Sequence, residues 1–342
     1  MLVSLAVAAC APVTPAPAAT EAIAAPGVSP YPGETVRLKL GAFAVMTNSP
    51  LIIAVEEGYF AKHGLDVELV LFSTASSAEA LPALVAGEID VLGQSFSAGH
   101  FNALAQGANF KAVADKGFLN PESCPTEAWV ASSSLMDSDA LDDPGNWSGL
   151  RITMRPGSHE EMMAEKLLQR AGLSLDDIEV VSLPDHAVRV DNLGSGTLDV
   201  AFLVEPWITR ATLGGSGETW VPWSELLPGL SVAYLYYGPG MLALDRDVGV
   251  RFMTGYLEGL RQYREGTTER NVEILSAFTG LTPDEMGTMC WPSFQPDAKI
   301  DTGPLVEFQE WALAKGYLDE ILPIDAFWDP SFLIEAQALL EP

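Results

Sequence analysis

Basic side chains are scarce in this chain. Its 342 residues include 18 Lys and Arg against 46 Asp and Glu, which gives a formal net charge of −28. Nucleic-acid binding requires clusters of Lys and Arg that neutralise phosphates, and the nearest approach, Arg261, Arg264 and Arg270, is diluted by Glu. The composition therefore argues against a nucleic-acid partner, and we attribute the acidic excess to solubility.

Cysteine and histidine are also few, which limits metal and redox chemistry. The chain has 3 Cys and 4 His residues, no Cys-x-x-Cys motif and no His spacing typical of a metal site. We therefore predict no metal site and no cofactor. Cys124 and Cys290 are an even pair that can form a disulfide in an exported chain. The sequence does not show whether they lie close together, so the paired and free states both stay open.

Long hydrophobic runs are absent, because no apolar stretch reaches the roughly 18–20 residues of a membrane-spanning helix. A short apolar stretch, Leu2 to Ala9, nevertheless opens the chain and runs into Val7-Ala8-Ala9-Cys10. Small residues before a Cys resemble a bacterial lipobox, although no positive charge precedes them as in ordinary secretory signals. We predict that residues 1–10 are a lipoprotein signal and that Cys10 carries the lipid. The protein would then be anchored by lipid to the outer face of the bacterial cytoplasmic membrane.

Residues 11–35 contain many Pro and Ala residues and few bulky side chains. Such a segment cannot bury enough apolar surface to fold, and it favours extended conformations. We predict that it is a tether, since a spacer after a lipidated Cys suits a protein held outside a membrane.

The rest of the chain contains an internal duplication. One apolar-periodic helix ends at Gly64-Leu65 and another at Gly172-Leu173, 108 residues later, and a β-rich run follows each. A Gly-x-x-Asp motif recurs at Gly87 and Gly196, 109 residues apart. Gly is the expected residue just after a helix, because it tolerates the left-handed conformation. We interpret the pattern as two copies of a β-α-β-α-β unit.

Strands that alternate with helices predict an α/β protein of two lobes, each a mostly parallel sheet flanked by helices. Ligands of such sheets bind beyond the carboxyl ends of the strands, so we expect a cleft between the lobes. The loops that face it are 42–50, 72–77, 93–98, 155–159, 183–187 and 204–207.

Four segments of the sequence carry a family resemblance, namely residues 50–60, 63–68, 83–91 and Glu205-Pro206-Trp207. With them the chain resembles the substrate-binding proteins of ABC importers in the sulfonate-binding and thiamine-pyrimidine-synthase-like group. The resemblance implies a type II periplasmic-binding fold. Lobe one would comprise residues 36–120 and 238–342, and lobe two residues 121–237, with crossings near 117–130 and 234–240.

The resemblance also implies partners and a mechanism. An ABC permease and its ATPase would receive a small-molecule ligand from the closed protein, and a monomer suits closure of the cleft. A pyrimidine-synthase-like enzyme is an alternative of another class. The yeast-type enzymes of that group depend on a cysteine-rich iron motif that this chain lacks, so we predict binding and no catalysis.

Candidate ligand-binding residues come from the cleft loops. They are Asn48, Ser49, Phe72, Ser73, Thr74, Gln94, Ser95, Arg155, Ser158, Asp185, Glu205, Trp207 and Tyr237. Asn48-Ser49 and Ser158 mark helix starts, whose free N–H groups can hold ligand oxygens. Arg155 can clamp an anion or pair with Glu160 or Asp185 instead. Phe72 and Trp207 can face a flat ring or simply pack in the core.

The loop inventory favours one ligand class. The six loops hold several aromatic residues but a single Arg and no Lys, which suits a flat, mostly uncharged molecule. We therefore predict a heteroaromatic vitamin or precursor, either riboflavin or an aminopyrimidine precursor of thiamine. The alternative is a sulfonate such as taurine, or a nitrate-type anion, held by helix N-termini.

Overall fold

The computed structural model describes residues 31–74 and 77–340. Cys10 and residues 11–30 of the predicted tether lie outside this range. The end of the tether is described, and there Tyr31 lies against Arg251, with the guanidinium carbon 4.5 Å from the ring centroid. None of the described helices has both the length and the apolar character needed to cross a membrane.

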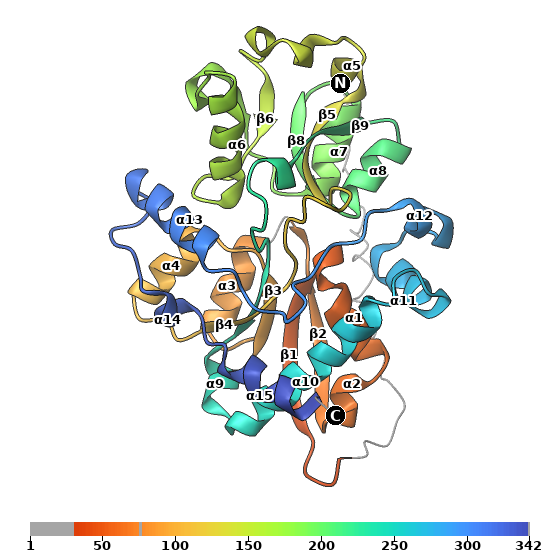
Figure 1. Ribbon diagram of the computed structural model, residues 1–342, viewed down its shortest axis with the longest axis vertical. Coiled ribbons are helices and arrows are strands. Elements are labelled where there is room, and N and C mark those ends of the chain that lie inside the picture. Colours follow the sequence, from red (N-terminus) through yellow and green to blue (C-terminus); the bar gives the residue numbers. More distant parts are fainter. Residues whose placement is uncertain (1–30, 75–76, 341–342) are drawn as a thin grey trace, which may run out of the picture.

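Two five-stranded sheets form the two lobes (Figure 1). The first has the order β2-β1-β3-β10-β4 and the second β7-β6-β8-β5-β9. In each sheet the fourth strand runs antiparallel to both neighbours and the other four run parallel. The strands are β1 (Val36–Phe43), β2 (Leu65–Phe72), β3 (Val91–Gln94), β4 (Lys111–Asp115), β5 (Glu127–Ser132), β6 (Arg151–Thr153), β7 (Glu179–Val181), β8 (Val200–Val204), β9 (Gly217–Pro222) and β10 (Tyr234–Tyr237). The predicted α/β fold of two lobes is confirmed.

Helices cover the sheets and complete the lobes (Figure 1). The first half of the chain supplies α1 (Ser49–Glu56), α2 (Tyr59–Lys62), α3 (Ser77–Val85), α4 (Ala98–Ala105), α5 (Ser133–Met136) and α6 (His159–Arg170). The second half supplies α7 (His186–Gly194), α8 (Trp207–Leu213), α9 (Pro239–Ala243), α10 (Arg246–Tyr263), α11 (Glu269–Thr279), α12 (Pro283–Thr288), α13 (Gly303–Ala314), α14 (Ile324–Phe327) and α15 (Ser331–Leu340). The helix that was predicted to end at Gly64-Leu65 is interrupted at Gly58, whose φ is +70°.

The duplicated motifs occupy equivalent places in the two lobes. Gly64, Gly87, Gly172 and Gly196 have φ between +71° and +73°, the left-handed conformation expected after a helix. The aspartates of the two Gly-x-x-Asp motifs also match. The Asp90 carboxylate accepts the Lys39 N–H at 2.8 Å, and the Asp199 carboxylate accepts the Arg151 N–H at 2.8 Å. Each Asp thus ties the start of the third strand of its unit to the first strand.

The crossings between lobes differ from the prediction at one place. The first crossing, residues 116–126, lies within the expected region, but the second is residues 223–233 rather than 234–240. Tyr234–Tyr237 pairs with β3 and β4 and belongs to the first sheet, so the predicted end of lobe two at residue 237 is wrong. All four of its residues are buried, as expected of a central strand covered on both faces.

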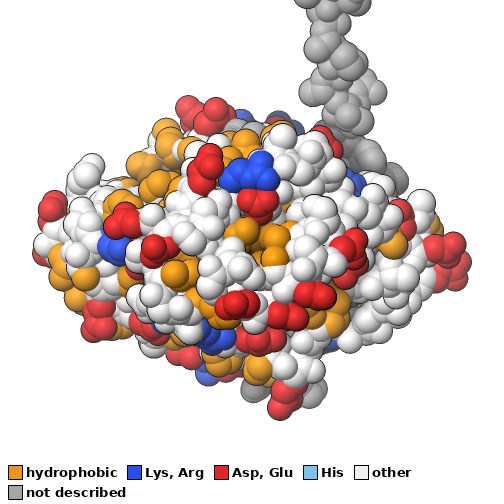
Figure 2. Space-filling model, turned by 90° about the horizontal axis from the view of Figure 1, so that it is seen from above, with side chains coloured by type: hydrophobic (Ala, Val, Ile, Leu, Met, Phe, Trp, Pro, Cys, Tyr) orange, Lys and Arg blue, Asp and Glu red, His pale blue; other side chains and the backbone are white. Residues whose placement is uncertain are grey.

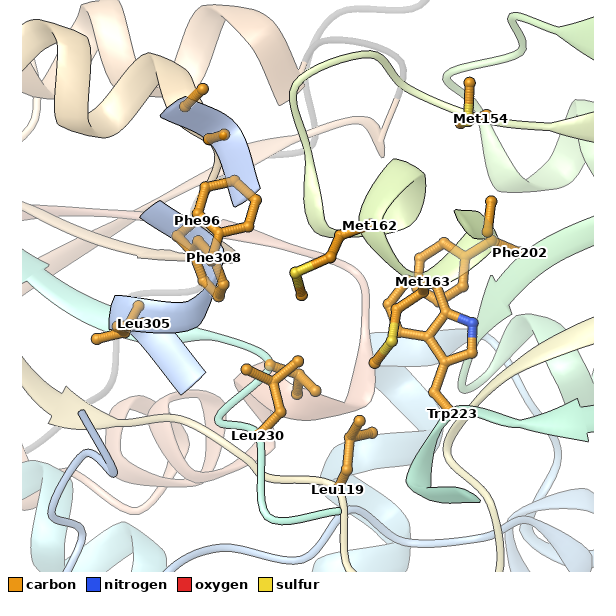
Figure 3. Packing of buried hydrophobic residues seen from close by; sticks show 14 of the residues in the cluster. Phe96, Leu119, Met154, Met162, Met163, Phe202, Trp223, Leu230, Leu305 and Phe308 are labelled. Carbon is orange, nitrogen blue, oxygen red and sulfur yellow. The ribbon is translucent and has the colours of Figure 1, made fainter. Parts of the chain in front are cut away.

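One hydrophobic cluster extends across both lobes. Figure 3 shows Met162 of α6 between the Phe96 and Phe308 rings on one side and Phe202 and Trp223 on the other. The outer faces of the sheets have clusters of their own. Acidic side chains outnumber basic ones on the face of the molecule seen from above, as Figure 2 shows. The charge excess therefore lies at the surface.

Cys124 and Cys290 form a disulfide, with their Cα atoms 5.8 Å apart. This decides the alternative that the sequence left open. The bond joins the first crossing to the segment after α12, 166 residues further along the chain. Both segments lie beside the space between the lobes, because Thr126 and Pro292 line the same cavity.

Candidate functional site

A cavity lies between the lobes, at the carboxyl ends of the parallel strands. Each of the six predicted cleft loops supplies at least one residue to its wall. The lining residues from these loops are Phe43, Val45, Thr47, Thr74, Gly93, Gln94, Ser95, Arg155, His159, Pro184, His186, Val204 and Glu205. The remaining wall is Lys116, Thr126, Glu127, Phe202, Val232, Ala233 and Pro292.

The cavity suits a small ligand. Its volume is about 80 Å³, several times the roughly 10–15 Å³ that one water molecule needs. A larger hollow of about 420 Å³ lies next to it and shares Gln94, Ser95 and Arg155. Apolar Leu81, Pro82 and Phe96 line that hollow.

The two lobes touch around the cavity. The Met46 N–H donates to the Glu205 carbonyl at 3.0 Å, and the Ala98 N–H donates to the Gly157 carbonyl at 2.9 Å. The Thr74 hydroxyl donates to an Asp185 carboxylate oxygen at 3.2 Å. These bonds join residues of different lobes, so the structure is a closed form.

Lys116 places a cation in the cavity wall. It follows β4 at the start of the first crossing and has no exposed surface. Its Nζ donates to the Thr47 hydroxyl at 3.2 Å. Burial lowers the pKa of Lys116 to about 7, although the Asp115 and Glu127 carboxyl groups act in the opposite direction. A side chain at Gly93 would come within 3.0 Å of Lys116 Cε, so glycine at that position leaves room for the lysine.

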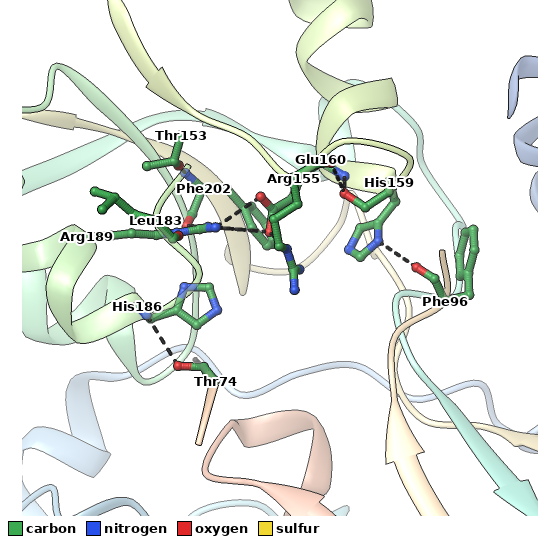
Figure 4. A network of polar contacts seen from close by, with 11 residues as sticks. Thr74, Phe96, Thr153, Arg155, His159, Glu160, Leu183, His186, Arg189 and Phe202 are labelled. Carbon is green, nitrogen blue, oxygen red and sulfur yellow. Dashed lines mark hydrogen bonds and ion pairs between the residues drawn. The ribbon is translucent and has the colours of Figure 1, made fainter. Parts of the chain in front are cut away.

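Arg155 places a second cation on the opposite lobe. Its Nε donates to a Glu160 carboxylate oxygen at 2.7 Å, and Glu160 also receives Arg189 Nη2 at 3.1 Å (Figure 4). Glu160 and Arg189 have no exposed side-chain surface, whereas the Arg155 side chain is 29% exposed. The pair with Glu160 was one of the two alternatives for Arg155, and the guanidinium still reaches the cavity.

Two neutral histidines flank Arg155 and point toward the same space (Figure 4). His159 Nδ1 lies 3.2 Å from the Phe96 carbonyl, which can only accept, so this nitrogen carries the proton. Burial and the charge of Arg155 lower the pKa of His159 to about 4. Burial and Arg189 hold the pKa of His186 well below its ordinary value, despite a hydrogen bond to the Phe202 backbone.

Two carboxyl groups complete the polar wall. Burial and the neighbouring charge of Glu160 raise the pKa of Glu127 to about 8, and its Oε2 has no hydrogen-bond partner within the described part of the chain. Burial also raises the pKa of Glu205 to about 7. Both Glu205 oxygens accept from Thr209, at 3.0 and 3.1 Å. Glu205 therefore anchors the start of α8.

Five of the predicted ligand-binding residues line the cavity: Thr74, Gln94, Ser95, Arg155 and Glu205. Ser158 lines the neighbouring hollow instead. It caps α6 by accepting the Glu160 N–H at 3.2 Å, and its hydroxyl donates to the Arg155 carbonyl at 2.7 Å. Asp185 caps α7 and bonds Thr74, so it reaches the ligand space only through its neighbours.

The structure places the predicted aromatic residues Phe72, Trp207 and Tyr237 outside the cavity wall. The Trp207 ring stacks on the His186 ring, with centroids 6.5 Å apart. The guanidinium carbon of Arg210 lies 4.6 Å from the Trp207 ring centroid. Phe72 lies behind Phe43, 5.8 Å away. Tyr237 is fully buried in lobe one, and its hydroxyl donates to the Gly249 carbonyl at 2.7 Å. These rings pack against the protein because their strands and helices turn them away from the cleft.

The remaining predicted residues also lie away from the cavity wall. Asn48 and Ser49 are fully buried, and the Asn48 amide donates to the Phe43 carbonyl at 2.9 Å. Ser73 is exposed. A short 3₁₀ turn, Met46–Asn48, precedes α1 and brings Thr47 to the cavity in place of Asn48.

Sequence reasoning missed Lys116, Glu127, His159, His186 and Phe202. His159 and His186 directly follow the predicted ligand-binding residues Ser158 and Asp185, so their positions in the cleft loops were an available signal. Lys116 and Glu127 border the first crossing, outside the six loops, and only the packing of the crossings brings them to the cavity. The described residues contain no group of three or more His, Cys, Asp or Glu placed to hold a metal ion.

A sequence model of the NMT1-like family matches residues 31–233. The chain is 28% identical over 204 residues to the bicarbonate transport ATP-binding protein CmpC of Synechocystis, covering 54% of this chain and 28% of that protein. It is 22% identical over 228 residues to a putative binding protein of Brucella abortus, covering 66% of each. The chain thus spans less than two thirds of these relatives.

Solved structures share the fold. The periplasmic nitrate-binding protein NrtA from Synechocystis has a TM-score of 0.71 at 17% identity, over 90% of both chains. The alkanesulfonate-binding protein SsuA from Xanthomonas axonopodis, bound to MOPS, has a TM-score of 0.65 at 20% identity, over 86% of this chain and 99% of that one. The desulfurization enzyme DSZB has a TM-score of 0.63 at 12% identity, over 90% of this chain and all of that one. At these identities the likeness concerns the fold alone.

Proposed function

The chain belongs to the NMT1-like family, and we propose that it is the solute-binding protein of an ABC importer that captures a small anion between its two lobes. The observation that carries the proposal is the cavity between the lobes, with one basic side chain from each side, Lys116 and Arg155. Charge-assisted hydrogen bonds from two such donors suit a sulfonate, nitrate or bicarbonate group. The named neighbours that bind nitrate and an alkanesulfonate support this ligand class.

The proposal replaces the vitamin that we expected from the loop inventory. That expectation depended on a cleft without Lys and with Trp207 as a stacking surface. Lys116 lies in the cavity wall and Trp207 does not. The neighbouring hollow with Leu81 and Phe96 offers space for the carbon chain of an organic sulfonate.

Binding without catalysis is part of the proposal. Ser158, His186 and Asp185 have the residue types of a nucleophilic triad, but the hydroxyl and the carboxylate bond to other groups. Ser158 donates to the Arg155 carbonyl and Asp185 accepts the Ala187 and Val188 N–H groups. An activated nucleophile requires the hydroxyl to donate to a base. The fold is also found in the enzyme DSZB, so this conclusion depends on the site and not on the fold.

The proposal also includes a permease with its ATPase as partners, a lipid at Cys10 and a monomeric state. Closure stabilised by ligand would present one surface, built from both lobes, to the permease. A signal that ends at Cys10 would hold the protein outside the cytoplasmic membrane, where an importer collects its solute. NrtA, which shares the fold, is described as periplasmic.

The first test is Lys116→Met, which keeps the length of the side chain and removes its charge. We expect anion binding to weaken by about tenfold to a hundredfold, because one charge-assisted hydrogen bond is worth about 1.5–3 kcal/mol. The affinity of the full chain is measured by isothermal titration with nitrate, bicarbonate, ethanesulfonate, taurine and riboflavin.

Lys299→Met is the matched control, since Lys299 is exposed and does not line the cavity. Tight riboflavin binding without binding of any anion would contradict the proposal. Equal anion affinity in wild type and Lys116→Met would show that the anion lies elsewhere.

A further inference from the structure

The two crossings between the lobes are bonded to each other and form a single connection. Residues 117–119 of the first crossing pair with residues 229–232 of the second, and we call this pairing the hinge ladder. Its backbone bonds run from the Val232 N–H to the Gly117 carbonyl at 2.8 Å, from the Leu119 N–H to the Leu230 carbonyl at 2.9 Å, and from the Gly229 N–H to the Leu119 carbonyl at 2.8 Å. Because each crossing holds the other, the hinge ladder moves as one unit.

The hinge ladder is fixed to lobe one. The Phe118 N–H donates to the Ser293 carbonyl at 3.0 Å, and Ser293 lies in the segment after α12. The next residue back, Pro292, accepts the hydroxyl of Tyr263 at 2.9 Å. Tyr263 is the last residue of α10, a helix of lobe one. Motion between the lobes must therefore occur where the crossings leave the hinge ladder for lobe two.

The disulfide carries the attachment to lobe one further along the first crossing. It ties Cys124 to Cys290, which lies in the same segment as Ser293. Two residues after Cys124, the Thr126 carbonyl accepts the Glu205 N–H at 3.0 Å, and this bond continues the pairing of β5 with β8 in lobe two. Pro125 is thus the single residue between the two attachments.

The second crossing has the same design. The Leu227 N–H donates to the Trp223 carbonyl at 3.1 Å, and the Trp223 ring is buried against Phe202 of lobe two, with centroids 3.9 Å apart. The hinge ladder begins at Gly229, so Pro228 is the single residue between the attachments. Hinges of two-lobed proteins are a few such residues at the ends of fixed elements.

The disulfide can be reached by a reductant. Cys124 is exposed, whereas Cys290 is half-buried. A thiolate of a dithiol would attack Cys124 Sγ, form a mixed disulfide and release Cys290 as a thiolate. The second thiol of the reductant would then displace Cys124, which leaves two thiols in the protein and one disulfide in the reductant.

Only side-chain bonds of the first crossing would then remain beyond the hinge ladder. The Asn120 amide donates to the Ser293 hydroxyl at 3.2 Å, and the Ser123 hydroxyl lies 3.1 Å from the same oxygen. The backbone bonds of the hinge ladder end at Leu119, so reduction would loosen residues 120–125 in place of Pro125 alone. Ordering a longer flexible segment costs more conformational entropy, so the closed form would lose stability relative to the open form.

We propose that the lobes turn about Pro125 and Pro228, and that the Cys124–Cys290 disulfide is a redox-sensitive restraint on this hinge. Reduction by a dithiol lengthens one side of the hinge, widens the opening of the free protein and weakens ligand binding. The ligand site feels the change because Thr126 and Pro292, beside the two cysteines, line the cavity. The inference goes beyond the proposed function and holds for any ligand of the cleft.

Dithiothreitol in excess tests the proposal on the full chain with Cys10→Ser, which removes the third cysteine. We expect two thiols to titrate in the folded protein and the radius of gyration of the free protein to increase in small-angle scattering. The affinity for nitrate or ethanesulfonate should fall about threefold to tenfold. A bond that resists the reductant in the folded protein, or full reduction with unchanged scattering, would overturn the proposal.

Hydrogen exchange separates a hinge effect from a general loss of stability. Peptides that cover residues 118–126 should exchange faster after reduction, while β1 and β8 keep their rates. Faster exchange throughout both sheets would overturn the hinge assignment. If neither anion binds, the proposed function fails, and scattering and exchange still decide this inference.

The variant with both Cys124→Ser and Cys290→Ser is the matched control for the reductant. It should reproduce the scattering of the reduced protein and should not respond to dithiothreitol. A response of equal size in this variant would show that the reductant acts elsewhere. The reduced protein with both cysteines decides the proposal even if the double variant fails to fold.

Discussion

Arg189 has no exposed surface. It lies against Phe202, which lines the cavity. Its guanidinium donates to the Leu183 carbonyl at 2.6 Å, to the Phe202 carbonyl at 2.8 Å and to Glu160 at 3.1 Å. Burial alone would raise the pKa of Glu160, but Arg155 and Arg189 lower it to about 2. The buried pair therefore stays ionised and fixes the carboxylate that positions Arg155.

We expect Arg189→Met to lower the free energy of unfolding at pH 7 by about 3–5 kcal/mol, because breaking a buried ion pair leaves a charge without its partner. Urea unfolding measures the change. The folded pKa of Glu160 lies below its ordinary value of 4.5, so the pair contributes stability above about pH 4.5 and loses it as pH falls toward 2. The difference between variant and wild type should shrink over that range. Exposed Arg170, on the same helix as Glu160, is the control, and Arg170→Met should change stability by about 0.5 kcal/mol or less.

Both lobes contain the Gly-x-x-Asp motif, but its Asp accepts more hydrogen bonds in lobe two than in lobe one. Asp90 accepts one backbone N–H from Lys39 through its side chain. Asp199 accepts the equivalent N–H from Arg151 and also two bonds from the Arg151 guanidinium, at 2.9 and 2.7 Å. The same sequence motif thus closes the same strand pair, and the second copy adds a bidentate ion pair.

This difference predicts that replacing the Asp lowers the stability of the protein more at position 199 than at position 90. We expect Asp199→Ala to destabilise the protein by about 2–3 kcal/mol and Asp90→Ala by about 1 kcal/mol, since bonds to charged groups are worth more when they are bidentate. Denaturant midpoints of the two variants provide the comparison. Asp90→Asn keeps an acceptor and should cost less than Asp90→Ala. A larger loss at Asp90 than at Asp199 would contradict the assignment.

At the scale of the whole molecule, contacts between α6 and α13 close the lobes on the side of the larger hollow. Trp311 Nε1 donates to Glu165 at 2.7 Å, and Lys315 pairs with the same carboxylate. Lys166 pairs with Glu307 at 2.5 Å. Glu165 is the centre of this group, and it lies outside the cavity wall.

Glu165→Ala should therefore weaken ligand binding without touching the ligand. Loss of two cross-lobe contacts favours the open form, and we expect an affinity about threefold to tenfold lower. Small-angle scattering of the free protein should give a larger radius of gyration than wild type. Glu310→Ala, an exposed position on α13, is the control. Unchanged scattering and unchanged affinity would show that these contacts do not control closure.

Much of the architecture follows from local sequence rules. The paired glycines at 64 and 172 and at 87 and 196 end helices because only glycine tolerates their positive φ. Alternating strands and helices then require parallel sheets, whose carboxyl ends must face one space. For this reason all six predicted loops reach the cavity, although the chain alone did not show that Tyr234–Tyr237 returns to the first sheet.

The sequence by itself determined the duplicated α/β units, the two lobes and the edge at which a ligand binds, because each depends on periodicity and turn chemistry within short segments. Only the tertiary structure decided which side chains face the ligand. Trp207 and Phe72 pack against other rings of the protein. Lys116, at the start of the first crossing, lines the cavity. Cys124 forms a disulfide with Cys290, 166 residues further along the chain. These outcomes depend on packing between segments that are distant in the chain, which no local pattern records.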